Sequence, residues 1–416
     1  MKNQIQKNKA SFNIILLMLG LVMSSATQLR FSENIPIGFG EIMLSIWMLF
    51  ELSSFFLRKK SQITSSGMIV LLILLILLCF LIGTVESIHN NLFFINDFFR
   101  NFFPILFSFI ISFVLINIKD KVSYFYNFIF YFPIFFIFPL FLLLLYSFFQ
   151  PRLFSYTIFE YRFLGLSTNP NQLALYLCVI PFMLLLRISI FHSRFQKIMS
   201  ILFMLACFAI SYFCKSDALT LSWVVSIPFC VFYLIQGYKI NIKTLKSVFL
   251  KIVLPSILAV TVLFVLFFQL QNLETEFISR SEAEGNQGGV RVALWQNGIR
   301  VMLDSPLFGL GPGAFSGIEK PYDSMEAHNT FIDLGINAGF IGLFFYLCLI
   351  FLVARLLFKK SKILFVWVIS LILFSVFHFV LRQPIFWVYL LIPYLFLKQG
   401  NIVGEKNVWN FRLHQF

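Results

Sequence analysis

Repeated apolar runs, each close to the roughly 20 residues that cross a lipid bilayer, constrain this sequence more than any other feature. A bilayer offers no water to unpaired backbone groups, so spanning segments must be helices or closed barrels, and continuous apolar runs favour helices over alternating barrel strands. The sequence therefore predicts an all-α polytopic membrane protein with about 12 transmembrane helices, at 12–28, 39–57, 67–85, 100–117, 124–149, 171–189, 198–214, 219–237, 248–270, 330–354, 363–380 and 385–397.

The composition excludes a soluble protein. Hydrophobic residues make up 59% of the chain and charged residues 12%, whereas globular domains are about half apolar and a quarter charged. Soluble enzymes and soluble nucleotide-binding folds are therefore excluded.

The distribution of basic residues orients the spans, because cytoplasmic loops are enriched in Lys and Arg. Twelve spans place both termini on one side. With the termini in the cytoplasm, the inner segments hold 22 of the 32 basic residues and 3 of the 18 acidic residues, which gives them a net charge of +19. The outer segments hold the other 10 basic and 15 acidic residues, which gives them a net charge of −5. We therefore expect cytoplasmic termini, and the net charge of +14 reflects topology rather than a nucleic-acid-binding surface.

The start of the chain has a competing interpretation as a cleaved signal peptide. Its Lys-rich head precedes the apolar residues 14–23 and the small residues Ser24-Ser25-Ala26. Removing this segment would leave eleven spans and spoil the charge alternation of the remaining loops, so a retained first helix is favoured.

The outer loops divide the chain into three parts. Residues 1–270 hold the first nine spans and a short outer segment at 150–170. Residues 271–329 form one large outer loop with an interfacial helix, and residues 330–416 hold the last three spans and a cytoplasmic tail. Since loops on a rigid scaffold carry binding and catalytic residues, we expect function in the two long outer segments.

Ionisable residues are scarce at the span centres, where they would mark an ion or substrate path. Asp97 and Asp333 lie near outer ends, and the deepest candidate, His378, is interpreted as a packing or interfacial histidine. A proton-coupled transporter would need buried carboxylates near the midplane. The sequence favours a reaction at the outer face, which must use a donor activated elsewhere, such as a lipid-linked diphosphate sugar.

The first outer segment holds an arginine just above an apolar span. Arg162 precedes Asn169-Pro170-Asn171, where Asn169 suits the helix cap and Pro170 the first helical turn. A capped helix start explains these residues without a function. It does not explain Arg162, which is therefore a candidate functional residue.

The second outer segment contains about four turns of predicted helix at 290–303. Arg291 and Trp295 are four residues apart and share a face. An interfacial helix needs no catalytic role. A position on such a helix and a functional role are equally good explanations of Arg300. An apolar stripe suits the bilayer surface and consists of Val292, Ile299 and Met302.

A glycine-rich stretch follows at 305–313, reading Ser-Pro-Leu-Phe-Gly-Leu-Gly-Pro-Gly. It superficially suggests a phosphate-binding loop, but it follows no strand and lacks the GK[ST] ending, so the nucleotide interpretation fails. A tight turn that returns the chain to the membrane is favoured, with backbone amides touching an anion as a minor alternative.

His328 and Asn329 stand at the outer start of a span, where a helix N-terminus favours anions. A lone histidine there is usually interfacial packing. Its position beside Asn329, downstream of the Arg-bearing segments, makes His328 a candidate catalytic residue.

Three stretches in order resemble the O-antigen ligase and polymerase superfamily, multi-span glycosyltransferases of the GT-C type. The stretches are Arg162-x-x-Gly165 with Asn169-Pro170-Asn171, then Arg291-x-x-x-Trp295 with the turn at 306–313, and His328-Asn329 with Gly339-x-x-Gly342. One departure lies between the outer segments, where similar proteins often have a Ser-Arg/Lys-Gly/Thr-like turn. Here the basic residue precedes the serine, as Lys215-Ser216.

The resemblance implies transfer of an undecaprenyl-diphosphate-linked oligosaccharide onto an acceptor hydroxyl at the periplasmic face of a bacterial inner membrane. Arginines matching Arg162 and Arg291 are thought to hold the donor diphosphate in that family, and the histidine matching His328 to activate the acceptor. Supporting roles are expected for Asn329, Asn171, Lys215, Arg300 and Trp295.

The residues themselves are compatible with this chemistry. Guanidinium groups stabilise the charge of a departing diphosphate without a metal, and an imidazole near neutral pKa can take the acceptor proton. A single displacement would invert the anomeric carbon. We expect no cofactor and no metal, although Glu282 and Glu284 leave a metal site open.

The acceptor and one other class of function stay open. A polymerase joins one lipid-linked glycan to another, a ligase attaches the glycan to lipid A core, and a relative attaches it to protein. The compact outer loop favours the polymerase. A lipid-linked oligosaccharide flippase also has about twelve spans, but it should have a charged central cavity and two related halves.

Overall fold

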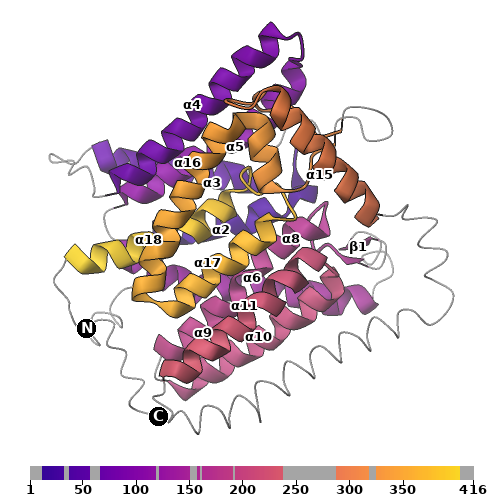
Figure 1. Cartoon of the computed structure of the whole chain (residues 1–416). Coiled ribbons are helices and arrows are strands. Elements are labelled where there is room, and N and C mark those ends of the chain that lie inside the picture. The colour runs from indigo at the N-terminus through magenta and orange to yellow at the C-terminus, as the bar shows by residue number, and fades with distance from the viewer. Residues whose placement is uncertain are drawn as a thin grey trace.

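The computed structural model describes residues 12–31, 37–56, 66–118, 121–149, 157–159, 162–190, 193–237, 287–317 and 325–402. Most of these residues are helical (Figure 1). Ile158–Phe159 (β1) and Arg162–Phe163 (β2) form one short antiparallel pair, with Phe159 opposite Arg162. The α-helices are α2 (Phe12–Ser25), α3 (Phe39–Phe56), α4 (Gly67–His89), α5 (Ile95–Asn117), α6 (Lys121–Phe149), α8 (Pro170–Leu177), α9 (Ile180–Ile190), α10 (Arg194–Cys214), α11 (Asp217–Gly237), α15 (Gln287–Asp304), α16 (Thr330–Lys360), α17 (Lys362–Ser375) and α18 (Pro384–Ile402), and a 3-10 turn covers Thr27–Leu29.

The expected spans correspond to apolar helices. Within the described residues, seven segments are long and apolar enough to cross a membrane, one of them being α8 and α9 together, and four shorter apolar helices accompany them. These eleven segments coincide with eleven of the twelve expected spans. The remaining one, at 248–270, lies outside the described residues. The prediction of an all-α polytopic membrane protein is confirmed.

Helices approach closely where small residues meet, because lipid supplies no hydrophobic force between them and packing must replace it. α2 packs along α3, and a Cβ on Gly40 would lie 2.1 Å from the backbone nitrogen of Ser24. α4 packs along α16, and a Cβ on Gly83 would lie 3.0 Å from the carbonyl oxygen of Asn337. Any larger side chain at these glycines would push the helices apart.

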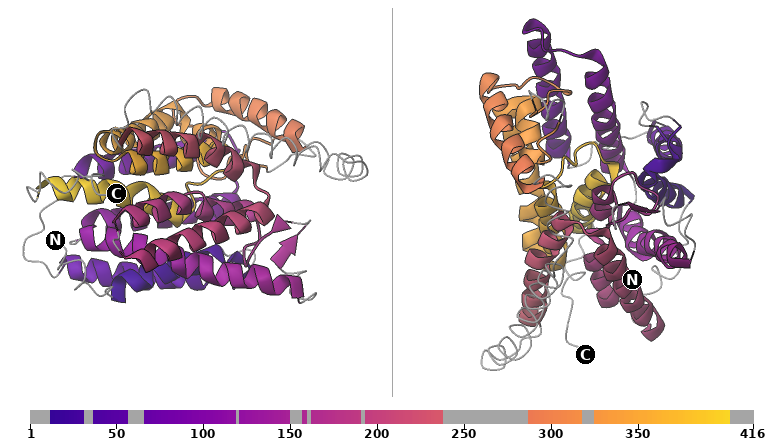
Figure 2. Two further views of the ribbon diagram at one scale, coloured as in Figure 1. Left: turned by 90° about the horizontal axis from the view of Figure 1, so that it is seen from below. Right: turned by 90° about the vertical axis from the view of Figure 1, so that its right-hand side faces the viewer.

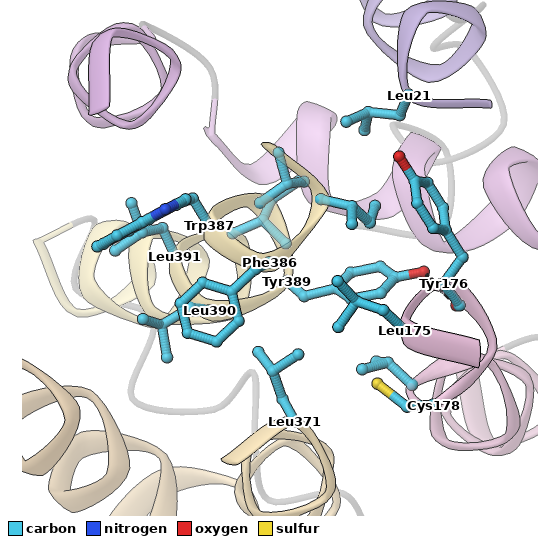
Figure 3. Close-up of a cluster of buried hydrophobic side chains, with 14 of the residues drawn as sticks. Leu21, Leu175, Tyr176, Cys178, Leu371, Phe386, Trp387, Tyr389, Leu390 and Leu391 are labelled. Atoms are coloured by element: carbon cyan, nitrogen blue, oxygen red, sulfur yellow. Dashed lines mark hydrogen bonds between the residues drawn. The ribbon is translucent and has the colours of Figure 1, made fainter. Parts of the chain in front are cut away.

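The core lies where α8, α17 and α18 meet α2 (Figure 3). Its buried tyrosines have hydrogen-bond partners that replace water. The Tyr389 hydroxyl donates to the carbonyl of Tyr176 at 2.8 Å, and the Tyr176 hydroxyl lies 2.7 Å from Ser24 Oγ. These bonds tie α18 to α8 and α8 to α2.

α16 is interrupted at Gly339, whose φ of 64° and ψ of −171° are not helical. The interruption frees peptide groups that form hydrogen bonds with the loop at 305–311. The chain turns back on itself in this loop, as the sequence predicts. Because the amides of this loop donate to protein carbonyls, the alternative of an anion held by them loses support. The pairing consists of Leu310 N to Ile336 O (2.8 Å), Gly311 N to Asn337 O (3.0 Å), Phe340 N to Pro306 O (2.7 Å) and Ile341 N to Leu307 O (3.2 Å).

One end of the bundle collects the irregular segments, and we call it the loop-rich end, formed by residues 26–31, 89–95, 162–170, 305–317, 325–329 and 376–383. These segments bond to one another across long distances in sequence. Gln28 N donates to Leu166 O at 3.0 Å, and Thr330 Oγ1 donates to His378 O at 2.5 Å. α4 and α5 extend beyond the neighbouring helices there (Figure 2).

α15 runs across the ends of the spanning helices rather than along them (Figure 1). It packs on α16 at Gly298, where a Cβ would lie 2.6 Å from the side chain of Ile332. The expected apolar stripe needs one correction, because Met302 faces α16 and packs with Val301 and Ile336. The exposed stripe instead consists of Val292, Ile299 and Leu303, which are 52%, 46% and 59% exposed.

Candidate functional site

Arg162 is held at the loop-rich end by the β1–β2 pair and by two hydrogen bonds. Its Nε donates to the carbonyl of Cys214 at 3.3 Å, and its Nη2 donates to Oδ1 of Asn171 at 3.2 Å. These bonds use two of the five N–H groups of a guanidinium. The arginine is half-buried and joins β2, α8 and the end of α10.

Asn171 connects Arg162 to the turn between α10 and α11. Its Oδ1 also accepts a hydrogen bond from Ser216 Oγ at 2.9 Å. Lys215 caps α10 in the left-handed conformation, with φ 47°, directly after the carbonyl that binds Arg162. Asn171 and Lys215, both predicted as supporting residues, therefore lie beside Arg162. The caps predicted at Asn169 and Pro170 are also present, since Asn169 accepts from Asn171 N at 2.8 Å.

His328 sits in a short loop that is held from several directions. Its φ is 52°, a conformation that residues other than glycine rarely adopt. The Asp333 carboxylate accepts from the amide of Ala327 at 2.8 Å and from the amide of Asn329 at 3.0 Å, one on each side of His328. Trp295 Nε1 donates to the Ala327 carbonyl at 2.9 Å. Such strain persists only where surrounding contacts impose it, and it is concentrated at functional sites.

Asn329 caps α16. Its Oδ1 accepts from the amides of Phe331 at 3.0 Å and Ile332 at 3.4 Å, which satisfies two of the free N–H groups of the first turn. The cap and the Asp333 bonds act on the same loop. Asn329 therefore has a structural role that places His328 at the helix start.

Arg291 and Arg300 do not lie together. Arg291 is half-buried at the start of α15, and its positive charge acts on both His328 and His378. Arg300 follows nine residues later, which turns it to the opposite face of the helix and moves it about 13 Å along the axis. Its side chain is exposed. The structure thus brings Arg291 to the histidines and leaves Arg300 apart from them.

His378 lies in the connection between α17 and α18, beside His328. Its ring centroid is 6.4 Å from that of His328. Burial lowers the pKa of His378, and the charges of His328, Arg291 and Arg162 lower it further. Arg162 and Arg291 are thus both near enough for their charges to influence this one imidazole, which lies beside His328.

The surroundings of His328 favour its neutral imidazole. The His328 side chain is partly exposed, but the surrounding protein displaces water from the imidazole. This loss of solvation disfavours the charged ring and lowers the pKa of His328. The carboxylate of Glu326 opposes this shift, whereas the cations of Arg291 and Arg382 add to it. A neutral imidazole can accept a proton, so the electrostatics permit His328 to act as a base.

Residues 202–347, from α10 to the middle of α16, match a family model described as O-antigen ligase. The resemblance to the O-antigen ligase and polymerase superfamily is confirmed. No curated protein matches the chain significantly. The matched O-antigen ligase region contains Lys215, Arg291 and His328, whereas Arg162 and His378 lie outside it. The fold brings the latter two to the matched region.

An ion pair near His328 was missed by the sequence analysis. Arg382 Nη1 lies 2.6 Å from Glu326 Oε1, and Nη2 donates to Oε2 at 2.8 Å. Arg382 Nη1 also donates to Asn101 Oδ1 of α5 at 2.8 Å. A signal was available, because Arg382 is the one charged residue in the outer connection between the last two expected spans.

Metal ligation has no candidate cluster in the part of the chain that the structure describes, where no group of three or more His, Cys, Asp or Glu side chains could hold an ion. Glu282 and Glu284, which the sequence left open as metal ligands, lie outside the described residues.

Proposed function

We propose that this protein is a glycosyltransferase that moves an undecaprenyl-diphosphate-linked glycan onto an acceptor hydroxyl. The supporting observation is that the charges of Arg162 and Arg291, from segments far apart in sequence, both influence His378, which lies beside His328. Two guanidinium groups beside a neutral imidazole suit a reaction that expels a diphosphate and removes a proton.

The proposed reaction is a single displacement. Arg162 and Arg291 hold the donor diphosphate through charge-assisted hydrogen bonds, while the neutral imidazole of His328 accepts the proton of the acceptor hydroxyl. The hydroxyl oxygen bonds to the anomeric carbon as the carbon–oxygen bond to the diphosphate breaks. The bonding electrons leave with undecaprenyl diphosphate, and the anomeric configuration is inverted. No step requires a metal ion.

The charges at the two ends of the bundle support a periplasmic site. Among the described residues, the loop-rich end carries seven basic residues (Arg30, Arg100, Arg162, Lys215, Arg291, Arg300, Arg382) and seven acidic residues (Glu41, Glu86, Asp97, Asp217, Asp304, Glu326, Asp333). The opposite end carries nine basic residues (Lys121, Arg187, Arg194, Lys197, Arg355, Lys359, Lys360, Lys362, Lys398) and one acid, Glu51. Positive charge favours the cytoplasm. We infer cytoplasmic termini, an inner-membrane location and a periplasmic active site.

The acceptor is proposed to be a second lipid-linked glycan, so that the protein is a surface-polysaccharide polymerase. The compact outer loop supports this choice over a ligase that transfers to lipid A core. Purified protein given lipid-linked repeat units alone should produce longer lipid-linked chains. Products that form only when lipid A core is added would identify a ligase instead, and products on protein would identify a protein-directed transferase.

Alanine variants of Arg162, Arg291 and His328 test the site. Each should abolish elongation in cells at normal expression, because each removes diphosphate binding or proton acceptance. His89→Ala, an exposed histidine at the end of α4, is the matched control and should elongate normally. Full elongation by His328→Ala would remove its assignment as the base. Movement of lipid-linked sugar across vesicles without a new glycosidic bond would overturn the enzyme proposal in favour of a flippase.

A further inference from the structure

His378 has a buried polar atom that nothing in the described part of the chain satisfies. Its Nε2 is fully buried and has no hydrogen-bond partner there. A buried polar group without a partner is costly, and such groups in native proteins call for an explanation such as a ligand contact. The sequence analysis interpreted this histidine as packing, and packing alone leaves the nitrogen unexplained.

The loop that carries His378 is fixed at the start of α16. Thr330 Oγ1 donates to the His378 carbonyl at 2.5 Å and accepts from the amide of Val380 at 3.1 Å. The imidazole packs near the ring of Phe374, with 5.0 Å between centroids. Backbone and ring are therefore positioned by α16 and α17, which gives the imidazole a defined place beside His328.

The surroundings of this imidazole are cationic. Arg162 and Arg291 both act on it, and His328 is its neighbour at 6.4 Å between ring centroids. Among the described residues, the acidic group that acts on His328 itself is Glu326, which Arg382 already binds. A neutral imidazole among cations can donate an N–H hydrogen bond to an anion without adding to their mutual repulsion.

We propose that His378 is a third donor-binding residue, whose Nε2–H donates to an oxygen of the diphosphate that Arg162 and Arg291 hold. This inference rests on the proposed function, because it assumes that the anion at the site is the donor diphosphate. It assigns the two histidines different tasks. His328 accepts the proton of the acceptor, and His378 binds the leaving group.

Binding of undecaprenyl diphosphate to the full-length protein in lipid nanodiscs tests the assignment without knowledge of the sugar. His378→Ala should weaken binding by roughly tenfold to a hundredfold, the range expected for one hydrogen bond to a charged group. His378→Gln keeps an N–H group at about the distance of Nε2 and should recover much of the affinity. Binding of undecaprenol, which has no diphosphate, should be the same for all variants, and His89→Ala should bind the diphosphate like the wild type.

The outcomes separate this inference from the function on which it rests. Normal binding by His378→Ala, together with weak binding by Arg162→Ala and Arg291→Ala, overturns the role of His378 and leaves the donor site intact. Normal binding of undecaprenyl diphosphate by His378→Ala, Arg162→Ala and Arg291→Ala overturns both the role of His378 and the proposed donor site. Equal loss of undecaprenol and undecaprenyl diphosphate by His378→Ala, with no recovery in His378→Gln, shows a packing role and also overturns the inference.

Discussion

The carboxylate of Asp333 accepts a hydrogen bond of 3.0 Å from the backbone amide of Asn329, one helical turn earlier in the chain. Its other oxygen accepts from the amide of Ala327 at 2.8 Å, so a single buried side chain holds the backbone amides of the residues on both sides of His328. The left-handed backbone of His328 depends on these bonds because its conformation is unfavourable without them.

Asp333→Asn should reduce kcat by up to about tenfold, because an amide offers one acceptor oxygen where the carboxyl group offers two, and one hydrogen bond contributes about 0.5–1.5 kcal/mol. The donor KM should change little, since the diphosphate is held by the arginines. Steady-state elongation of a lipid-linked repeat unit measures both constants. Asp304→Asn, an exposed acid at the end of α15, is the control. An unchanged kcat in Asp333→Asn would show that the loop does not need this carboxylate.

Activity should fall on the acid side as His328 becomes protonated. Because the pKa of His328 is lowered, the acid limb of kcat/KM should lie below the ordinary histidine pKa of about 6.5. The charged groups that act on this imidazole are Glu326, Arg291 and Arg382. His378, at 6.4 Å between ring centroids, is its titratable neighbour.

Two variants should move this limb in opposite directions. Glu326→Gln removes the negative charge that favours the protonated ring, so the limb should shift to lower pH. Arg382→Gln removes a cation and leaves Glu326 unpaired, so the limb should shift to higher pH. The pH profile of each variant measures the shift. Shifts in the same direction, or none in either variant, would show that a group other than His328 controls the acid limb.

Local sequence patterns predicted the helices and one of their caps but not the groups that meet across the loop-rich end. Hydropathy placed the spans because each apolar run must satisfy its own backbone in lipid. The Asn169 cap was readable because capping depends on neighbours in sequence. Arg382 joins Asn101 and Glu326 across long stretches of chain, and no local pattern reports such a pairing.

The error at Met302 has a similar cause. Helical periodicity predicts which residues share a face but not which neighbour covers that face. The loop at 305–311 folds back onto α16, so Met302 packs there and Leu303 takes the exposed position. The surroundings of His378 could not be predicted, because its unsatisfied nitrogen and the arginine charges that influence it are apparent only in three dimensions.

Gly339→Ala should destabilise the protein strongly. The residue has φ 64° and ψ −171°, a backbone region that essentially only glycine adopts and that costs other residues roughly 1–3 kcal/mol, and an added Cβ would lie 2.3 Å from the backbone of Leu307. Both the break in α16 and the pairing of loop 305–311 would be disturbed. Gly67→Ala is a suitable control, because no atom lies within 4 Å of the added Cβ. Thermal unfolding in detergent should show a clearly lower midpoint for Gly339→Ala alone, and equal midpoints would contradict the proposed constraint.

Arg162→Lys should weaken donor binding even though it keeps the positive charge. The guanidinium of Arg162 uses Nε and Nη2 to bind Cys214 and Asn171, and a lysine ammonium cannot hold these two partners and a diphosphate in the same fork geometry. We expect a donor KM roughly tenfold higher, the effect of losing about one hydrogen bond to a charged group. Arg100→Lys, an exposed arginine on α5, should leave the KM unchanged. A wild-type KM in Arg162→Lys would mean that the site needs only a point charge at this position, and Asn171→Ala, which removes one anchor of the guanidinium, should then also have no effect.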